Sequence, residues 1–167
     1  GVSIRKFFGK DVKSSPDYPR LINERHFDRV AGLMSGGTIV TGGETDRGTR
    51  YIAPTLLTDV SPDAEVMREE IFGPVLPVIT YAKLDEAINF ITSRPKPLAL
   101  YVFAKSGDIQ NEVIDRTSSG GACINDVVMH LAIPDLPFGG VGASGMGAYH
   151  GRASFDTFSH ARSVLTK

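Results

Sequence analysis

The chain has 167 residues, which suits one domain with a sizeable hydrophobic core. Its formal net charge of −1 leaves no basic surface for a nucleic acid or an anionic lipid, and its longest apolar runs, such as PLALYVFA, are too short to span a bilayer. A single cysteine excludes an internal disulfide and favours a reducing, cytoplasmic location.

The first residues, GVSIRKFFGKDV, begin with glycine rather than methionine and are typical of the end of a helix. We therefore expect the chain to be a piece of a longer protein, although a processed or tagged start would give the same pattern. Residues 18–37 follow and predict a helix, because Phe27, Val30 and Met34 recur at helical spacing. A glycine pair at its end can terminate this helix.

Two strands and a helical turn are expected next. TIVTGG indicates a short strand closed by glycines, and YIAPTLLTDV indicates a second strand. Pro54 near the start of that second strand cannot donate a ladder hydrogen bond, so we expect the strand to lie at a sheet edge. Asp63 is expected to cap a short helical turn in AEVMREE.

Strands and helices alternate regularly from residue 74 to residue 125. The predicted strands are PVLPVITYA, PLALYVFAK and ACIND, and the predicted helices between them are LDEAINFITSR and SGDIQNEVIDR. This order predicts an α/β fold in which helices flank a parallel sheet with right-handed crossovers.

The regular pattern stops after Asn125. Residues 127–151 are rich in glycine and proline, and a loop of this length is usually functional or bound against another segment. A short helix, RASFDTFSH, and a last strand, RSVLTK, close the chain. The strand at residues 162–167 has no obvious partner in residues 1–161, so we expect it to be an oligomerisation element that pairs with another subunit.

The loop contains a G-x-G-x-x-G pattern at Gly140, Gly142 and Gly145, which binds a pyrophosphate in many dinucleotide-binding domains. That function needs a strand directly before the first glycine and a helix that begins at the third. Two prolines precede the pattern and another glycine follows it, and neither suits those elements. We interpret the stretch as a glycine-rich turn that lets the backbone approach another group closely.

Cys123 lies in a predicted buried strand, where a small apolar residue fits, and we interpret it as structural rather than nucleophilic. The four histidines have no zinc-ligand spacing and no second cysteine beside them, so we expect no metal site. A Ser-His-Asp arrangement stays open, although no nucleophile elbow is visible.

REEIFGPVLPV places Glu70 and Phe72 just before a turn into a predicted strand. A carboxylate and an aromatic ring two residues apart at such a turn make a plausible ligand platform. The alternative is a helix end with solvated acids and one phenylalanine in the core.

Six stretches, taken together and in this order, resemble the C-terminal part of aldehyde dehydrogenases: INERHFDRV, YIAPTLLTDV, EEIFGPVLPV, KPLALYVFA, SSGGACIND and LPFGGVGASGMGAYHGRASFDTFSHAR. The resemblance covers essentially the whole chain, and GMGAYHG and SFDTFSH are most similar to the class 3 branch, which acts on fatty, aromatic and medium-chain aldehydes. EEIFGPV and PFGGVGxSGxG are the specific motifs.

The resemblance implies the chemistry of that family. An upstream cysteine attacks the aldehyde, hydride passes to NAD or NADP, and a water activated by a glutamate hydrolyses the thioester. On the matched positions, Glu70 is expected to bind the hydroxyls of the nicotinamide ribose and Phe72 to pack beside the nicotinamide ring. Phe138 is expected near the aldehyde pocket, whose wall the glycines shape, and His26 is expected to approach the cofactor from the far side of the cleft.

The family's nucleophile, general base and oxyanion asparagine all lie upstream of the matched part, so this chain is expected to contribute no catalytic residue. We expect the C-terminal portion of an NAD(P)-dependent aldehyde dehydrogenase, inactive alone, completed by the missing N-terminal part and assembled as a homodimer. One alternative is a non-catalytic truncated paralogue that serves as a structural or regulatory subunit. Another is a stand-alone small-molecule binding domain that uses Glu70 and Phe72.

Overall fold

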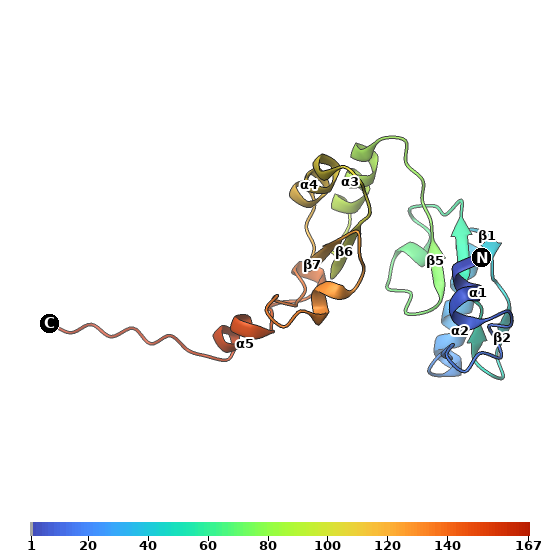
Figure 1. The fold of residues 1–167 in the computed structure, drawn as a ribbon, viewed down its shortest axis with the longest axis horizontal. Helices are drawn as coiled ribbons and strands as arrows, with labels where there is room; N and C mark the ends of the chain where they lie inside the picture. The colour runs from blue at the N-terminus through green and yellow to red at the C-terminus, as the bar shows by residue number, and fades with distance from the viewer. Residues whose placement is uncertain (1) are drawn as a thin grey trace. The chain divides into compact units, whose positions relative to one another are not determined.

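The computed structural model describes residues 2–167, which form two compact units that divide between Thr80 and Tyr81 (Figure 1). Each unit has its own helices, strands and hydrophobic core. The expected α/β class is confirmed, since both units combine helices with parallel strand pairs.

The first unit contains helices α1 (Val2–Phe8) and α2 (Glu24–Leu33), single 3-10 turns η1 (Met34–Gly36) and η2 (Glu65–Met67), and strands β1 (Thr38–Thr41), β2 (Thr45–Asp46), β3 (Tyr51–Ile52), β4 (Thr55–Thr58) and β5 (Val75–Pro77). Strand β4 lies between β1 and β5, antiparallel to β1 and parallel to β5. Strands β2 and β3 form a separate antiparallel pair.

Helix α2 forms within the predicted range 18–37 but is shorter than predicted, since it begins at Glu24 and ends at Leu33. Asn23 caps its N-terminus, since the Asn23 side chain accepts a hydrogen bond from the amide of His26 at 2.8 Å. Phe27, Val30 and Leu33 are buried on one face and pack into the main core of the unit. His26 and Arg29 lie beside this buried face and are half-buried, so they can contact other segments of the unit.

Two local expectations in this unit were wrong. The stretch YIAPTLLTDV is broken at Pro54 into β3 and β4, which belong to different sheets, and β4 is a central strand rather than an edge strand. Pro54 lies before β4, so its missing amide removes no hydrogen bond from that ladder, and Thr55 donates the first one to the carbonyl of Pro74. Asp63 does not cap η2. Ala64 occupies the N-cap position, and no side chain caps the amides of η2.

The second unit contains helices α3 (Leu84–Thr92), α4 (Gly107–Arg116) and α5 (Gly151–Thr157), turns η3 (Met129–Ala132) and η4 (Gly142–Ser144), and strands β6 (Ala99–Val102) and β7 (Gly121–Ile124). Strands β6 and β7 pair in parallel, and α4 forms the crossover between them. Ile88 of α3, Val102 of β6 and Val113 of α4 form the core, with the two helices packed together on the pair (Figure 1).

The predicted three-strand parallel sheet is divided in the structure. Strand β5 pairs with β4 and belongs to the first unit, so only β6 and β7 pair as expected. The strand expected at residues 162–167 is also not formed within this chain, because residues 159–167 have no regular secondary structure and are exposed. A strand needs a partner to supply its hydrogen bonds, and pairing of this segment with another subunit stays a prediction.

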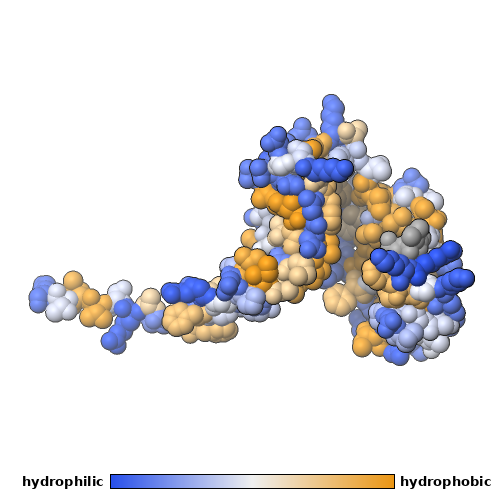
Figure 2. Space-filling model, viewed as in Figure 1, coloured by the Kyte–Doolittle hydropathy of each residue, from blue (hydrophilic) through white to orange (hydrophobic). Residues whose placement is uncertain are grey.

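Large apolar side chains are exposed on both units, and they show as orange surface in Figure 2. In the second unit they include Phe103 and Ile124, which follow and end the two paired strands, and Phe158 after α5. Apolar surface of this extent is typical of faces that contact another segment or another protein.

Candidate functional site

The segment from Glu69 to Gly73, which we call the 69–73 turn, precedes β5. It contains both residues of the expected cofactor platform, Glu70 and Phe72. Phe72 has a φ of +50°, in the left-handed region that residues other than glycine rarely adopt. The residue as a whole is 73 % exposed. A phenylalanine in the core, the alternative weighed for this position, is therefore excluded within the first unit.

Side chains of α2 hold this turn. The Nε2 atom of His26 lies 2.7 Å from the carbonyl oxygen of Phe72, and the two rings meet edge to face with centroids 6.3 Å apart. Arg29 donates from Nη2 to the carbonyl oxygen of Ile71 at 2.6 Å and from Nη1 to the carboxylate of Glu69 at 2.8 Å. Sequence reasoning missed Arg29, although its position three residues after His26 places both on one side of the helix.

Glu70 is placed differently from Glu69. Its side chain is exposed, and no hydrogen bond or ion pair joins its carboxylate to another residue in the part of the chain that the structure describes. Both carboxylate oxygens are therefore available to hydrogen-bond donors from outside the unit. The arrangement brings together an available carboxylate and an exposed aromatic ring, which suits a ligand with a diol and a flat ring.

Phe138 lies in the glycine-rich loop of the second unit. Its amide donates to the carbonyl of Tyr149 at 2.8 Å, and the amide of Tyr149 donates back at 3.0 Å. The Phe138 ring stacks on the imidazole of His150 and tilts against that of His130, each with centroids 6.0 Å apart. The ring is therefore packed against two imidazoles, which restrict its orientation.

The glycines of this loop allow close backbone packing, as expected. A Cβ atom on Gly140 would lie 2.1 Å from the carbonyl oxygen of Ser144, and one on Gly139 would lie 2.1 Å from that of Gly147. No strand leads directly into Gly140, and no helix begins at Gly145, so the features of a pyrophosphate-binding turn are missing from this part of the described chain. A pocket of about 500 Å³ lies beside the loop, lined in part by Gly140, Tyr149 and Phe158.

Cys123 is buried in β7, as its sequence context indicates, but it has a partner that the sequence did not suggest. Its Sγ atom lies 3.2 Å from Nδ1 of His130, which is itself buried. The other ring nitrogen of His130, Nε2, is buried without a hydrogen-bond partner. The seven-residue separation matches no common metal or catalytic motif, so only the folded loop reveals the pair.

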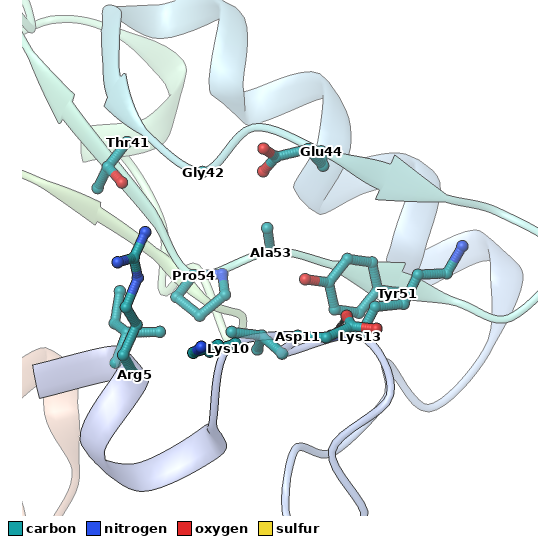
Figure 3. A pocket seen from close by; sticks show the side chains of 12 residues that line it. Arg5, Lys10, Asp11, Lys13, Thr41, Gly42, Glu44, Tyr51, Ala53 and Pro54 are labelled. Carbon is teal, nitrogen blue, oxygen red and sulfur yellow. Dashed lines mark hydrogen bonds between the residues drawn. The ribbon is translucent and has the colours of Figure 1, made fainter. Parts of the chain in front are cut away.

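A second pocket, of about 430 Å³, lies in the first unit and is lined by α1, the loop that follows it, and the segments around Gly42 and Tyr51. Figure 3 shows the side chains of Arg5, Lys10, Glu44 and Tyr51 among those that line it. Burial and the nearby Glu44 carboxylate raise the pKa of the Tyr51 phenol. Because the lining carries both signs of charge, it selects neither an anion nor a cation.

No group of three or more histidine, cysteine, aspartate or glutamate side chains among residues 2–167 could hold a metal ion. Within the same residues, every helix is too short or too polar to cross a membrane.

Comparisons with known proteins match the chain over nearly its whole length. The family model described as "Aldehyde dehydrogenase family" matches residues 5–164. The chain is 59 % identical to "Aldehyde dehydrogenase family 3 member A2" of Rattus norvegicus, over 99 % of this chain and 34 % of that protein. It is 57 % identical to "Aldehyde dehydrogenase, dimeric NADP-preferring" of Bos taurus, over 99 % of this chain and 69 % of that protein.

Solved structures agree with these matches. The structure described as "Substrate bound state of Staphylococcus Aureus AldH" has a TM-score of 0.91 and 50 % identity, covering 99 % of this chain and 38 % of that one. An aldehyde dehydrogenase from Mycobacterium tuberculosis, described as complexed with NAD+, has a TM-score of 0.82 and 27 % identity, covering 99 % of this chain and 36 % of that one. The chain therefore spans about a third of the length of most of these relatives.

Proposed function

Because this chain belongs to the aldehyde dehydrogenase family, we propose that it is the C-terminal portion of an NAD(P)-dependent enzyme that oxidises aldehydes to carboxylic acids. The observation that carries the proposal is the 69–73 turn, which exposes the Glu70 carboxylate and the Phe72 ring together. Relatives support the cofactor, since one is described as NADP-preferring and one solved neighbour is described as complexed with NAD+.

Glu70 supplies the contact with the nicotinamide ribose. A carboxylate accepts one hydrogen bond with each oxygen, and the two vicinal hydroxyls of a ribose donate at a matching spacing. Phe72 supplies an exposed flat ring beside which the nicotinamide packs. A bound nicotinamide accepts the hydride from the substrate, and these two residues orient it for that step. Direct contact between His26 and the cofactor stays a prediction. The Nε2 atom of His26 is hydrogen-bonded to the carbonyl oxygen of Phe72.

Phe138 and the glycine-rich loop contribute to the aldehyde pocket. The ring packs against two imidazoles, and the pocket of about 500 Å³ beside the loop is lined mainly by glycine and apolar side chains. Such a lining suits the hydrophobic tail of an aldehyde rather than a charged substrate.

In this proposal, the groups that attack the aldehyde and hydrolyse the thioester lie outside this chain. Its only thiol, Cys123, is buried against His130 rather than exposed to a substrate. A nucleophile, a general base and the oxyanion donors therefore come from an N-terminal part of the same protein, and the exposed apolar surface of the second unit suits contact with it. The proposal includes a homodimer and a cytoplasmic location. A truncated paralogue that acts as a structural or regulatory subunit is the second candidate, since the chain spans about a third of most relatives.

The experiment compares the full-length protein encoded by the source gene with its Glu70→Gln variant and with Glu65→Gln, a matched change at an exposed glutamate outside the turn. We expect Glu70→Gln to weaken NAD(P) binding and slow hydride transfer in stopped flow, while Glu65→Gln behaves as wild type. Unchanged cofactor affinity together with an unchanged hydride-transfer rate would remove Glu70 from the cofactor site. A source gene whose coding sequence begins at residue 1 would favour the truncated paralogue.

A further inference from the structure

We propose that His26 and Arg29 are positioning residues: they hold the 69–73 turn in the backbone conformation that presents Glu70 and Phe72 to the cofactor. The proposal rests on the proposed function of that turn. It assigns to α2 a role in cofactor binding through the backbone of another segment, without requiring either side chain to touch the cofactor.

The turn needs such support because of Phe72. Its φ of +50° is a conformation that glycine adopts freely and that a residue with a Cβ atom adopts only when the surroundings hold it. Phe72 is 73 % exposed, so packing of its side chain within the unit supplies little of the holding force. The backbone on either side of Phe72 must therefore be fixed by other groups.

Two hydrogen bonds fix it. Arg29 donates to the carbonyl of Ile71 at 2.6 Å, which orients the peptide group before Phe72. His26 bonds to the carbonyl of Phe72 at 2.7 Å, which orients the peptide group after it. Because φ and ψ describe the rotations of these two planar groups about the Cα atom, holding both groups defines the conformation of Phe72.

The spacing on α2 matches the turn residue by residue. His26, Arg29 and Val30 lie at positions i, i+3 and i+4, on one side of the helix. Val30 approaches Gly73 so closely that a Cβ atom on Gly73 would lie 2.8 Å from Val30 Cγ1. The helix thus contacts three consecutive residues of the turn through three of its own side chains.

Arg29 also determines which ring nitrogen of His26 carries the hydrogen. Its Nη2 atom lies 3.4 Å from Nδ1 of His26, and a guanidinium only donates hydrogen bonds. Nδ1 is then the acceptor, so the ring hydrogen lies on Nε2 and points at the carbonyl of Phe72. Arg29 further pairs with Glu69, which leaves the neighbouring Glu70 as the carboxylate available to a ligand.

The experiment uses the full-length protein and the variants Arg29→Met and Arg29→Lys. Arg29→Met keeps the length of the side chain and removes every donor, whereas Arg29→Lys keeps one donor and the charge. Arg25→Met is the matched control, because Arg25 lies on the same helix, is exposed and makes no hydrogen bond or ion pair with the turn among the described residues. Binding of NAD and NADP is measured by titration calorimetry, and folding is checked by circular dichroism.

We expect Arg29→Met to weaken NAD(P) binding about tenfold, the loss typical of one charge-assisted hydrogen bond, with KM for the cofactor raised more than KM for the aldehyde. Arg29→Lys is expected to recover part of that loss, and Arg25→Met to bind as wild type. A readout without cofactor follows the turn itself: endoproteinase Glu-C cleavage after Glu69 and Glu70, identified by mass, should become several-fold faster in Arg29→Met alone.

The outcomes separate this proposal from the proposed function. If the wild-type protein binds neither nucleotide, the proposed function fails, while faster Glu-C cleavage of Arg29→Met still supports the hold on the turn. If wild type binds and Arg29→Met binds equally well, the positioning role is overturned, whatever the cleavage rate. If Arg29→Met does not fold, His26→Phe replaces it, since it keeps a ring and removes the donor to Phe72, and the same two measurements then decide.

Discussion

Cys123 and His130 lie side by side in the interior of the second unit, with Sγ 3.2 Å from Nδ1. The thiol comes from β7 and the imidazole from η3, which follows it in the chain. Both residues are over nine-tenths buried, and the remaining ring nitrogen of His130 has no hydrogen-bond partner. The pair fixes the imidazole against which the Phe138 ring tilts, so it links the buried strand to the glycine-rich loop.

Replacing Cys123 by alanine tests the structural role of this thiol. The change leaves a buried imidazole without its remaining partner, and we expect a loss of about 1–3 kcal/mol in the free energy of unfolding of the chain. Chemical denaturation measures it. In the full-length protein, aldehyde turnover should stay within a few-fold of wild type. Abolished turnover, in a variant that is still folded, would show that Cys123 is a nucleophile and would contradict the structural assignment.

The two first glycines of the G-x-G-x-x-G pattern should respond differently to alanine. At Gly140 the new Cβ atom would lie 2.1 Å from a backbone oxygen, so the loop must move. At Gly142 the space is open, with Lys96 Cδ 3.9 Å away, and the cost comes only from its φ of +63°, about 1–2 kcal/mol. We expect Gly140→Ala to be the more destabilising change in thermal unfolding.

The same pair of variants separates the two interpretations of the pattern. Because the glycines shape the substrate side in the proposed function, Gly140→Ala should reduce activity on bulky aldehydes before it affects NAD(P) affinity. A variant that lost cofactor binding first would revive the pyrophosphate-binding interpretation.

Tyr18 should make the stability of the chain fall at high pH. Burial, followed by the nearby Tyr51, raises the pKa of the Tyr18 phenol to about 12, from 10.0 in an exposed tyrosine. The folded state therefore holds this proton more tightly than the unfolded state. Its contribution is present below about pH 10 and is lost as the pH rises from 10 to 12. The phenol donates to the carbonyl of Ile52 at 2.7 Å, and this bond is lost on ionisation.

Denaturation midpoints of wild type and Tyr18→Phe, measured between pH 9 and pH 12, check this expectation. The difference between the two proteins should shrink across that window. Tyr81→Phe is the control, because Tyr81 is exposed and should leave the wild-type profile unchanged. A constant difference in midpoint between wild type and Tyr18→Phe would show that ionisation of Tyr18 does not affect stability in this pH range.

The C-terminal residues 162–167 allow a test of the proposed homodimer. They are exposed and have no strand partner in this chain, and an unpaired segment of this kind can complete the sheet of a second subunit. We expect deletion of these six residues from the full-length protein to shift sedimentation velocity profiles toward the monomer. A dimer of unchanged stability would exclude the segment from the interface.

Purified residues 1–167 should reduce neither NAD nor NADP with any aldehyde. The chain offers one thiol, and that thiol is buried against His130. Removing the nucleophile from such a catalytic unit typically lowers the rate by many orders of magnitude. Absorbance at 340 nm with a panel of aliphatic and aromatic aldehydes is the measurement, and turnover that Cys123→Ala abolishes would contradict the prediction.

Local features of the fold could be predicted because their causes are local. Asn23 before a run with buried residues at positions 27, 30 and 33 determines helix α2 through capping and periodicity, and both act within a few residues. The same holds for α3, α4 and the pairing of β6 with β7, where a helix of ordinary length returns the chain to the same sheet. Glu70 and Phe72 were found through the resemblance of their motif, not through periodicity.

What the tertiary structure decided lies between segments far apart in the chain. The partner of β5 is β4 rather than β6, and Pro54 divides one apolar stretch between two sheets. His26 and Phe72 are 46 residues apart, so no local pattern could show that α2 holds the turn and that Phe72 is left-handed. The sequence by itself determined which segments contain helices and which motif carries the platform, since propensity and spacing are short-range. The conformation of that platform depends on hydrogen bonds to peptide groups, which become defined only when distant segments pack together.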